Sequence, residues 1–194
     1  MHDETDFIWS RKSGDLEFTH RYPHLHFGLV LFLDFDGVLH PQDCPAQEMF
    51  CFMGNFVDAM RIIDPEHRMP IVISSMWRHR VSVDGLRSRF PGDIASQIVG
   101  ATPYKTLAEV EAITDWTIYG GIESKKRHRQ REVMQWMNEF APDGDWIAID
   151  DRPQYFHRNE PRLFVVPGEG LSGFTTEVAT SFISRVRSSN VKQG

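Results

Sequence analysis

Five consecutive apolar residues, Leu29-Val-Leu-Phe-Leu33, run directly into Asp34-Phe-Asp36. Such a run, bounded by polar residues, is typical of a strand buried on both faces in a parallel sheet. Similar runs occur at 71–73, 97–99, 146–149 and 163–166, and apolar residues at helical spacing occupy 52–63, 125–140 and 175–186. This alternation predicts an α/β fold, a Rossmann-like three-layer sandwich with a mainly parallel central sheet.

The length of 194 residues suits one domain. Residues 1–27 are polar and irregular, so we expect an N-terminal extension there and a core over 28–190. The two cysteines, Cys44 and Cys51, have neither the number of a disulfide framework nor the spacing of a zinc site. They indicate ordinary thiols in a reducing compartment.

The formal net charge of −6 argues against a generic nucleic-acid binder held by diffuse positive charge, although a local basic site remains compatible with it. The acidic N-terminus lacks the apolar stretch of a signal peptide, and the longest apolar run is too short to span a bilayer. We therefore expect a cytoplasmic protein without a membrane partner.

The first predicted strand ends in two closely spaced carboxylates. Residues i and i+2 of an extended chain point the same way, so Asp34 and Asp36 are expected to face one spot. Two such carboxylates repel unless a cation or a shared proton neutralises them. Gly37 permits a sharp departure of the chain. A calcium EF-hand is excluded, because Val38 and Pro45 stand where a ligand and the closing glutamate are required.

The second predicted strand ends at Ser74-Ser75. A hydroxyl here can donate a hydrogen bond to a phosphoryl oxygen, or it can cap the helix that follows. Arg78 comes shortly afterwards and is placed to line the mouth of a site.

The fourth predicted strand ends at Asp150-Asp151. In parallel sheets ligands bind at the carboxyl ends of the strands, so this pair is expected to converge with Asp34 and Asp36. Carboxylate oxygens grouped in this way suit a hard divalent cation, Mg²⁺ best of all. A phosphate is the anionic substrate that usually accompanies Mg²⁺, and it needs a positive side chain nearby.

The basic run over 125–131 supplies candidates for that positive charge. At about 100° per residue, with Val133 as the buried direction, Lys126 and Arg129 fall on the buried side and Arg131 on the opposite face. We therefore predict that Arg129 or Lys126 contacts the phosphate, and that the other residues of the basic run form a solvated helix face.

Together these residues resemble the haloacid dehalogenase (HAD) superfamily of phosphohydrolases. Its four motifs match, in order, Asp34-Phe-Asp-Gly-Val38, Ser74-Ser75, Lys126 or Arg129, and Asp150-Asp151. The resemblance implies that Asp34 attacks phosphorus and that Asp36 acts as general acid and then as general base.

The same resemblance implies that Mg²⁺ is held by Asp34, the backbone carbonyl of Asp36, Asp151, and Asp150 directly or through water. Phosphoryl oxygens would be held by Ser75 or Ser74 and by Arg129 or Lys126, with Gly37 and Arg78 as further substrate contacts.

Finer features resemble a small branch that includes HAD domains of multidomain RNA-repair proteins: Ser75-Met-Trp-Arg78, Gly100-Ala-Thr-Pro103 and Arg129-x-x-Glu132. The gaps between motifs leave no room for a large cap domain. An open site favours an accessible phosphate, such as an RNA or DNA end or a nucleotide. The alternatives are a small-metabolite phosphatase and a regulatory or binding module. A receiver domain is one such module, but its acceptor aspartate should end the third strand rather than the first.

Overall fold

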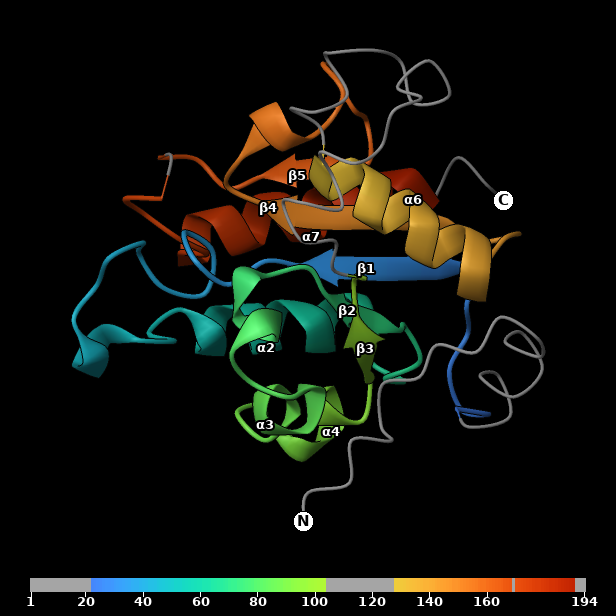
Figure 1. Ribbon diagram of the computed structural model, residues 1–194, viewed down its shortest axis with the longest axis horizontal. Helices are drawn as coiled ribbons and strands as arrows, with labels where there is room; N and C mark the ends of the chain where they lie inside the picture. The colour runs from blue at the N-terminus through green and yellow to red at the C-terminus, as the bar shows by residue number, and fades with distance from the viewer. Residues whose placement is uncertain (1–21, 104–127, 169, 191–194) are drawn as a thin grey trace.

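The computed structural model describes residues 22–103, 128–168 and 170–190. Within these ranges, parallel strands form one sheet in the order β3-β2-β1-β4-β5 (Figure 1). The strands are β1 (Leu29–Leu33), β2 (Ile71–Ile73), β3 (Ile98–Ala101), β4 (Asp145–Asp150) and β5 (Leu163–Val165). The predicted α/β fold is confirmed, and β3 begins and ends slightly later in the chain than expected.

The helices fall between and after these strands. They are α2 (Met53–Ile63), α3 (Val83–Arg87), α4 (Gly92–Ala95), α6 (His128–Phe140) and α7 (Thr176–Asn190), with short 3-10 turns η2 (Ala46–Glu48), η3 (Met76–His79) and η5 (Pro153–Tyr155). Helix α7 continues past the predicted end at residue 186. Across the described ranges, no helix is both long enough and apolar enough to cross a bilayer.

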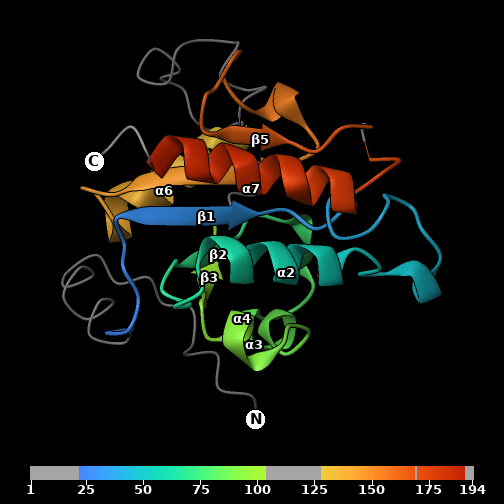
Figure 2. The same ribbon diagram turned by 180° about the vertical axis from the view of Figure 1, so that it is seen from behind.

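Both faces of β1 are covered, which explains why its sequence is apolar throughout. On one face Leu31 belongs to a core cluster with Phe56 and Phe182. These two residues come from α2 and α7, the helices that lie over this face of the sheet in Figure 2. On the other face the ring of Phe32 meets the edge of Trp136 of α6, with the ring centroids 5.7 Å apart. Successive residues of the strand therefore enter opposite layers of the sandwich.

Within the described residues, the connections that follow β1 and β2 form no large insertion over the carboxyl edge of the sheet. Residues 34–70 form η2, α2 and loops, and residues 74–97 form η3, α3 and α4. Neither of these two segments folds into a separate cap domain. The gap before the third motif continues into residues 104–127, so the expected lack of a cap stays a prediction. The segment 104–127 and residues 1–21 of the expected extension lie outside the described residues, so the boundary at residue 28 stays a prediction.

Candidate functional site

The ends of β1 and β4 bring three of the predicted carboxylates together. The two strands are neighbours with Leu33 opposite Ile149, so Asp34 and Asp150 leave the sheet side by side. Carboxyl oxygens of Asp34, Asp150 and Asp151 all lie within 4.8 Å of one another, and all three residues are buried. This group is called the carboxylate cluster below.

The side chain of Asp36 lies apart from the carboxylate cluster. Its Oδ1 accepts hydrogen bonds from Nε2 of His40 at 3.1 Å and from Nε1 of Trp77 at 3.0 Å. The expectation that Asp34 and Asp36 face one spot therefore fails for the carboxylates. The physical reason is that β1 ends at Leu33, so the alternation of an extended strand no longer governs the residues that follow.

The hydrogen bonds to Asp36 also determine its ionisation. Burial alone would raise the pKa of Asp36, but the hydrogen bonds from His40 and Trp77 outweigh burial and hold that pKa below its ordinary value. These hydrogen bonds therefore favour the ionised form of Asp36 and fix the orientation of its side chain.

Gly37 lets the loop after β1 approach the fourth motif closely. Its φ is +75°, and a Cβ at this position would lie 2.5 Å from Oδ2 of Asp151 and 2.9 Å from Cα of Gly170. Only glycine accommodates both the left-handed conformation and this contact. The predicted contact of Gly37 with substrate stays a prediction.

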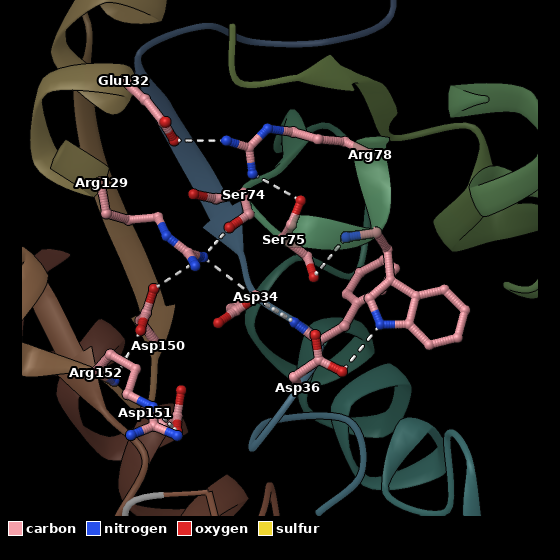
Figure 3. Close-up of polar contacts among 12 residues, drawn as sticks. Asp34, Asp36, Ser74, Ser75, Arg78, Arg129, Glu132, Asp150, Asp151 and Arg152 are labelled. Carbon is pink, nitrogen blue, oxygen red and sulfur yellow. Dashed lines mark hydrogen bonds and ion pairs between the residues drawn. The ribbon is translucent and has the colours of Figure 1, made fainter. Parts of the chain in front are cut away.

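Arg129 lies between the ends of three strands. Its Nη1 is 3.2 Å from Oδ1 of Asp34 and 3.2 Å from Oδ2 of Asp150, and it also donates to the backbone carbonyl of Ser74 (Figure 3). The residue is only 4% exposed, as its predicted position on the buried side of the helix requires. Lys126, the alternative for this role, lies outside the described residues.

The charges of the carboxylate cluster are incompletely balanced. Burial raises the pKa of Asp150 to about 8, with the Arg129 charge opposing and the Asp34 charge adding to the effect. Burial also raises the pKa of Asp151 to about 6, again with help from the charge of Asp34. A bound cation stabilises the ionised form of buried carboxylates whose pKa values are raised in this way. The donor set consists of carboxylate oxygens, which fits Mg²⁺.

The two serines at the end of β2 differ in their surroundings. Oγ of Ser75 accepts a hydrogen bond from the backbone N–H of Trp77 at 3.4 Å and so caps η3. Oγ of Ser74 is buried and has no hydrogen-bond partner in the described part of the chain. The N–H of Ser74 donates to the carbonyl of Leu33 at 2.8 Å, so the end of β2 lies beside the end of β1.

Arg78 is held inside the protein rather than at an open mouth. Its Nη2 donates to Oε2 of Glu132 at 2.8 Å, and its Nη1 donates to the carbonyl of Ser75 at 2.7 Å (Figure 3). Its predicted contact with substrate stays a prediction. From the sequence, Glu132 was named only within the Arg129-x-x-Glu132 resemblance and was given no role. Its position three residues after Arg129 places both on one helix face.

Two further residues at the site were assigned no role from the sequence. Nε of Arg152 lies 3.0 Å from Oδ2 of Asp151, and the Arg152 guanidinium also donates to the side chain of Gln42. The position of Arg152 directly after Asp150-Asp151 could have indicated from the sequence that it lies at the site. The position of His40 in the sequence gave no such indication, because only the curled loop after Gly37 brings it back to Asp36.

The described part of the site therefore combines a buried carboxylate cluster, a hydrogen-bonded carboxyl group on Asp36 and a buried guanidinium on Arg129. A family model described as "HAD domain in Swiss Army Knife RNA repair proteins" matches residues 30–179, more than half of the chain and all of the motif positions predicted above. No curated protein and no solved structure matches the chain.

Proposed function

The chain belongs to the family of HAD domains in Swiss Army Knife RNA repair proteins, and from this membership we propose that it is a Mg²⁺-dependent phosphohydrolase acting on the phosphate monoester of an RNA or DNA end. The observation that carries the proposal is the position of Arg129, which bridges Asp34 and Asp150 at 3.2 Å each. A buried guanidinium beside a carboxylate nucleophile is suited to binding a phosphoryl group.

In the first half-reaction the carboxylate of Asp34 attacks phosphorus. The bond from phosphorus to the leaving oxygen breaks, and that oxygen takes a proton from the carboxyl group of Asp36. The product alcohol departs and the phosphoryl group stays on Asp34 as an aspartyl-phosphate. Arg129 stabilises the negative charge on the transferring oxygens, together with a hydroxyl of Ser75 or Ser74.

In the second half-reaction Asp36, now a carboxylate, removes a proton from water. The water oxygen attacks phosphorus, and the bond from phosphorus to Asp34 breaks. The products are inorganic phosphate and the free Asp34 carboxylate, and Asp36 holds the proton for the next turnover. The hydrogen bonds that favour the ionised form of Asp36 support this role as a base.

The residues that would hold Mg²⁺ are Asp34, Asp150 and Asp151, with the backbone carbonyl of Asp36 as a further ligand. The mutual proximity and burial of the three carboxylates, and the raised pKa values of Asp150 and Asp151, support this assignment. When bound, the cation would neutralise the carboxylates and attract the phosphate.

The choice of substrate rests on access and on the family. The described connections after β1 and β2 form no cap over the carboxyl edge of the sheet, which supports a polymer end as the substrate. The description of the family refers to RNA repair, which favours a nucleic-acid end over a small metabolite.

A panel of substrates tests the proposal. Phosphate release is measured from 3′- and 5′-phosphorylated oligonucleotides, mononucleotides and phosphosugars, with Mg²⁺ and with a chelator. We expect Mg²⁺-dependent release from an oligonucleotide end. Turnover confined to phosphosugars would favour the small-metabolite alternative, and Mg²⁺ binding without turnover of any member would favour a binding module.

A further inference from the structure

The two oxygens of the Asp36 carboxylate have different surroundings. Oδ1 accepts from both His40 Nε2 and Trp77 Nε1, whereas no donor in the described ranges reaches Oδ2. The Asp36 side chain is 39% exposed and the His40 side chain 2%. One oxygen is therefore fixed by the protein, and the other carries no hydrogen bond from the described residues.

The two donors are themselves held in place. The rings of His40 and Trp77 lie 5.8 Å apart, and each packs edge-on against Phe50, at 5.1 and 5.2 Å. Backbone contacts add to this, because the N–H of Gly37 donates to the carbonyl of His40 at 2.8 Å. Donors fixed by packing orient their acceptor at little entropic cost during reaction.

We propose that Trp77 and His40 are positioning residues that hold Oδ1 of Asp36, so that Oδ2 is the oxygen that passes the proton to the leaving group. This inference rests on the proposed function. When Asp36 is protonated, the proton belongs on Oδ2, because Oδ1 already accepts two hydrogen bonds. The leaving oxygen takes that proton as its bond to phosphorus breaks, which leaves Asp36 as the carboxylate.

The proposed roles of Trp77 and His40 predict different effects on alkyl and aryl phosphate substrates. A ribose oxygen leaves as a strongly basic alkoxide unless it is protonated, so its departure depends on correct placement of Asp36. A p-nitrophenolate ion is stable and departs without a proton. Loss of either positioning residue should therefore slow hydrolysis of an alkyl phosphate far more than that of an aryl phosphate.

The test compares kcat/KM for a 3′-phosphorylated oligonucleotide and for p-nitrophenyl phosphate, because kcat/KM covers only steps up to departure of the leaving group. Trp77→Phe removes the indole N–H and keeps an aromatic ring. We expect a loss of about 10²-fold with the oligonucleotide, and less than about 3-fold with the aryl ester. Trp146→Phe is the matched control, since Trp146 is buried at the opposite end of the sheet. It should leave both values unchanged.

A second pair of variants covers the case in which Trp77→Phe does not fold, as judged by circular dichroism. His40→Gln retains an N–H donor and should keep most of the oligonucleotide activity, whereas His40→Leu should lose it selectively. Equal losses on both substrates, or no difference between the two His40 variants, would overturn the inference while leaving the proposed function intact. A wild-type protein inactive on both substrates would instead refute the proposed function itself.

Discussion

Arg78 and Glu132, which lie 54 residues apart in the sequence, form an ion pair of 2.8 Å that is largely shielded from solvent. The pair joins η3, at the end of β2, to α6. Glu132 lies one turn after Arg129, so the same contact holds the first turn of α6 against the carboxylate cluster. Burial raises the pKa of Glu132, and the positive charges of Arg78 and Arg129 oppose that effect.

Removing Glu132 should destabilise the fold. Glu132→Ala removes the carboxylate that neutralises the buried guanidinium of Arg78, and breaking a buried ion pair in this way typically costs about 3–5 kcal/mol. Glu132→Gln keeps an acceptor and should cost less. Urea unfolding measures both, with Glu139→Ala on the same helix as the control. A cost for Glu132→Ala no larger than that of the control would contradict the prediction.

Replacing Asp34 should abolish catalysis without unfolding the protein. Asp34→Asn removes the attacking carboxylate and also reduces repulsion within the carboxylate cluster, so stability should be unchanged or increased. Release of p-nitrophenol reports activity, and circular dichroism reports the fold. Asp145→Asn, at the other end of the sheet, should retain full activity. Wild-type turnover by Asp34→Asn would exclude the covalent mechanism.

Mg²⁺ should stabilise the protein through the carboxylate cluster. A ligand that binds only the folded state at about 100 times its Kd contributes about 2.7 kcal/mol. Thermal unfolding should therefore shift to higher temperature with Mg²⁺ and return with a chelator. In Asp150→Asn the shift should be much smaller, because one oxygen ligand has become a neutral amide. An undiminished shift in that variant would place the cation elsewhere.

The guanidinium of Arg129 should contribute strongly to the rate. Arg129→Met removes the charge and should lower kcat by about 10²–10³-fold, by analogy with other transition-state donors. Arg129→Lys keeps the charge but not the planar fork, so an intermediate loss is expected. Steady-state kinetics distinguish the variants, and Arg187→Met, on the exposed face of α7, serves as the control. If kcat is unaffected in Arg129→Met, another cation must bind the phosphate.

His128 should make the fold less stable in mild acid. Burial, with repulsion from Arg129 and Arg131, lowers the pKa of His128 from 6.5 to about 4. In the unfolded chain the ring of His128 is therefore protonated below about pH 6.5, whereas in the folded chain it stays neutral until about pH 4. Stability conferred by the neutral ring is fully present above pH 6.5 and is lost as the pH falls through this window.

Urea unfolding between pH 7.5 and 5 measures this contribution. His128→Phe preserves the ring contact with Tyr155, whose centroid is 4.4 Å from that of His128, but cannot titrate. Its free energy of unfolding should decline less steeply than that of the wild type. His24→Gln, which removes an exposed histidine, should follow the wild-type slope. Parallel slopes for His128→Phe and wild type would be inconsistent with the prediction.

Local patterns were sufficient to predict the layers of the fold. The apolar run of β1 indicated a strand covered on both faces, and helical phasing placed Arg129 on the same side of α6 as Val133, where both are buried. These predictions succeed because burial of apolar residues at a fixed period depends on neighbours in the sequence. The strand ends then brought Asp34 and Asp150 together, because parallel strands present their carboxyl ends at one edge.

The contacts that orient the site depended on the tertiary structure. After Leu33 the chain leaves the sheet, so the hydrogen bonds from His40 and Trp77 determine the direction of the Asp36 carboxylate. His40 lies in the curled loop after Gly37, and Trp77 lies in η3. The sequence by itself determined which residue types gather at the sheet edge. Only the folded chain decided which donor meets which oxygen, because a hydrogen bond depends on ångström-scale distance and on angle, neither of which a periodic pattern encodes.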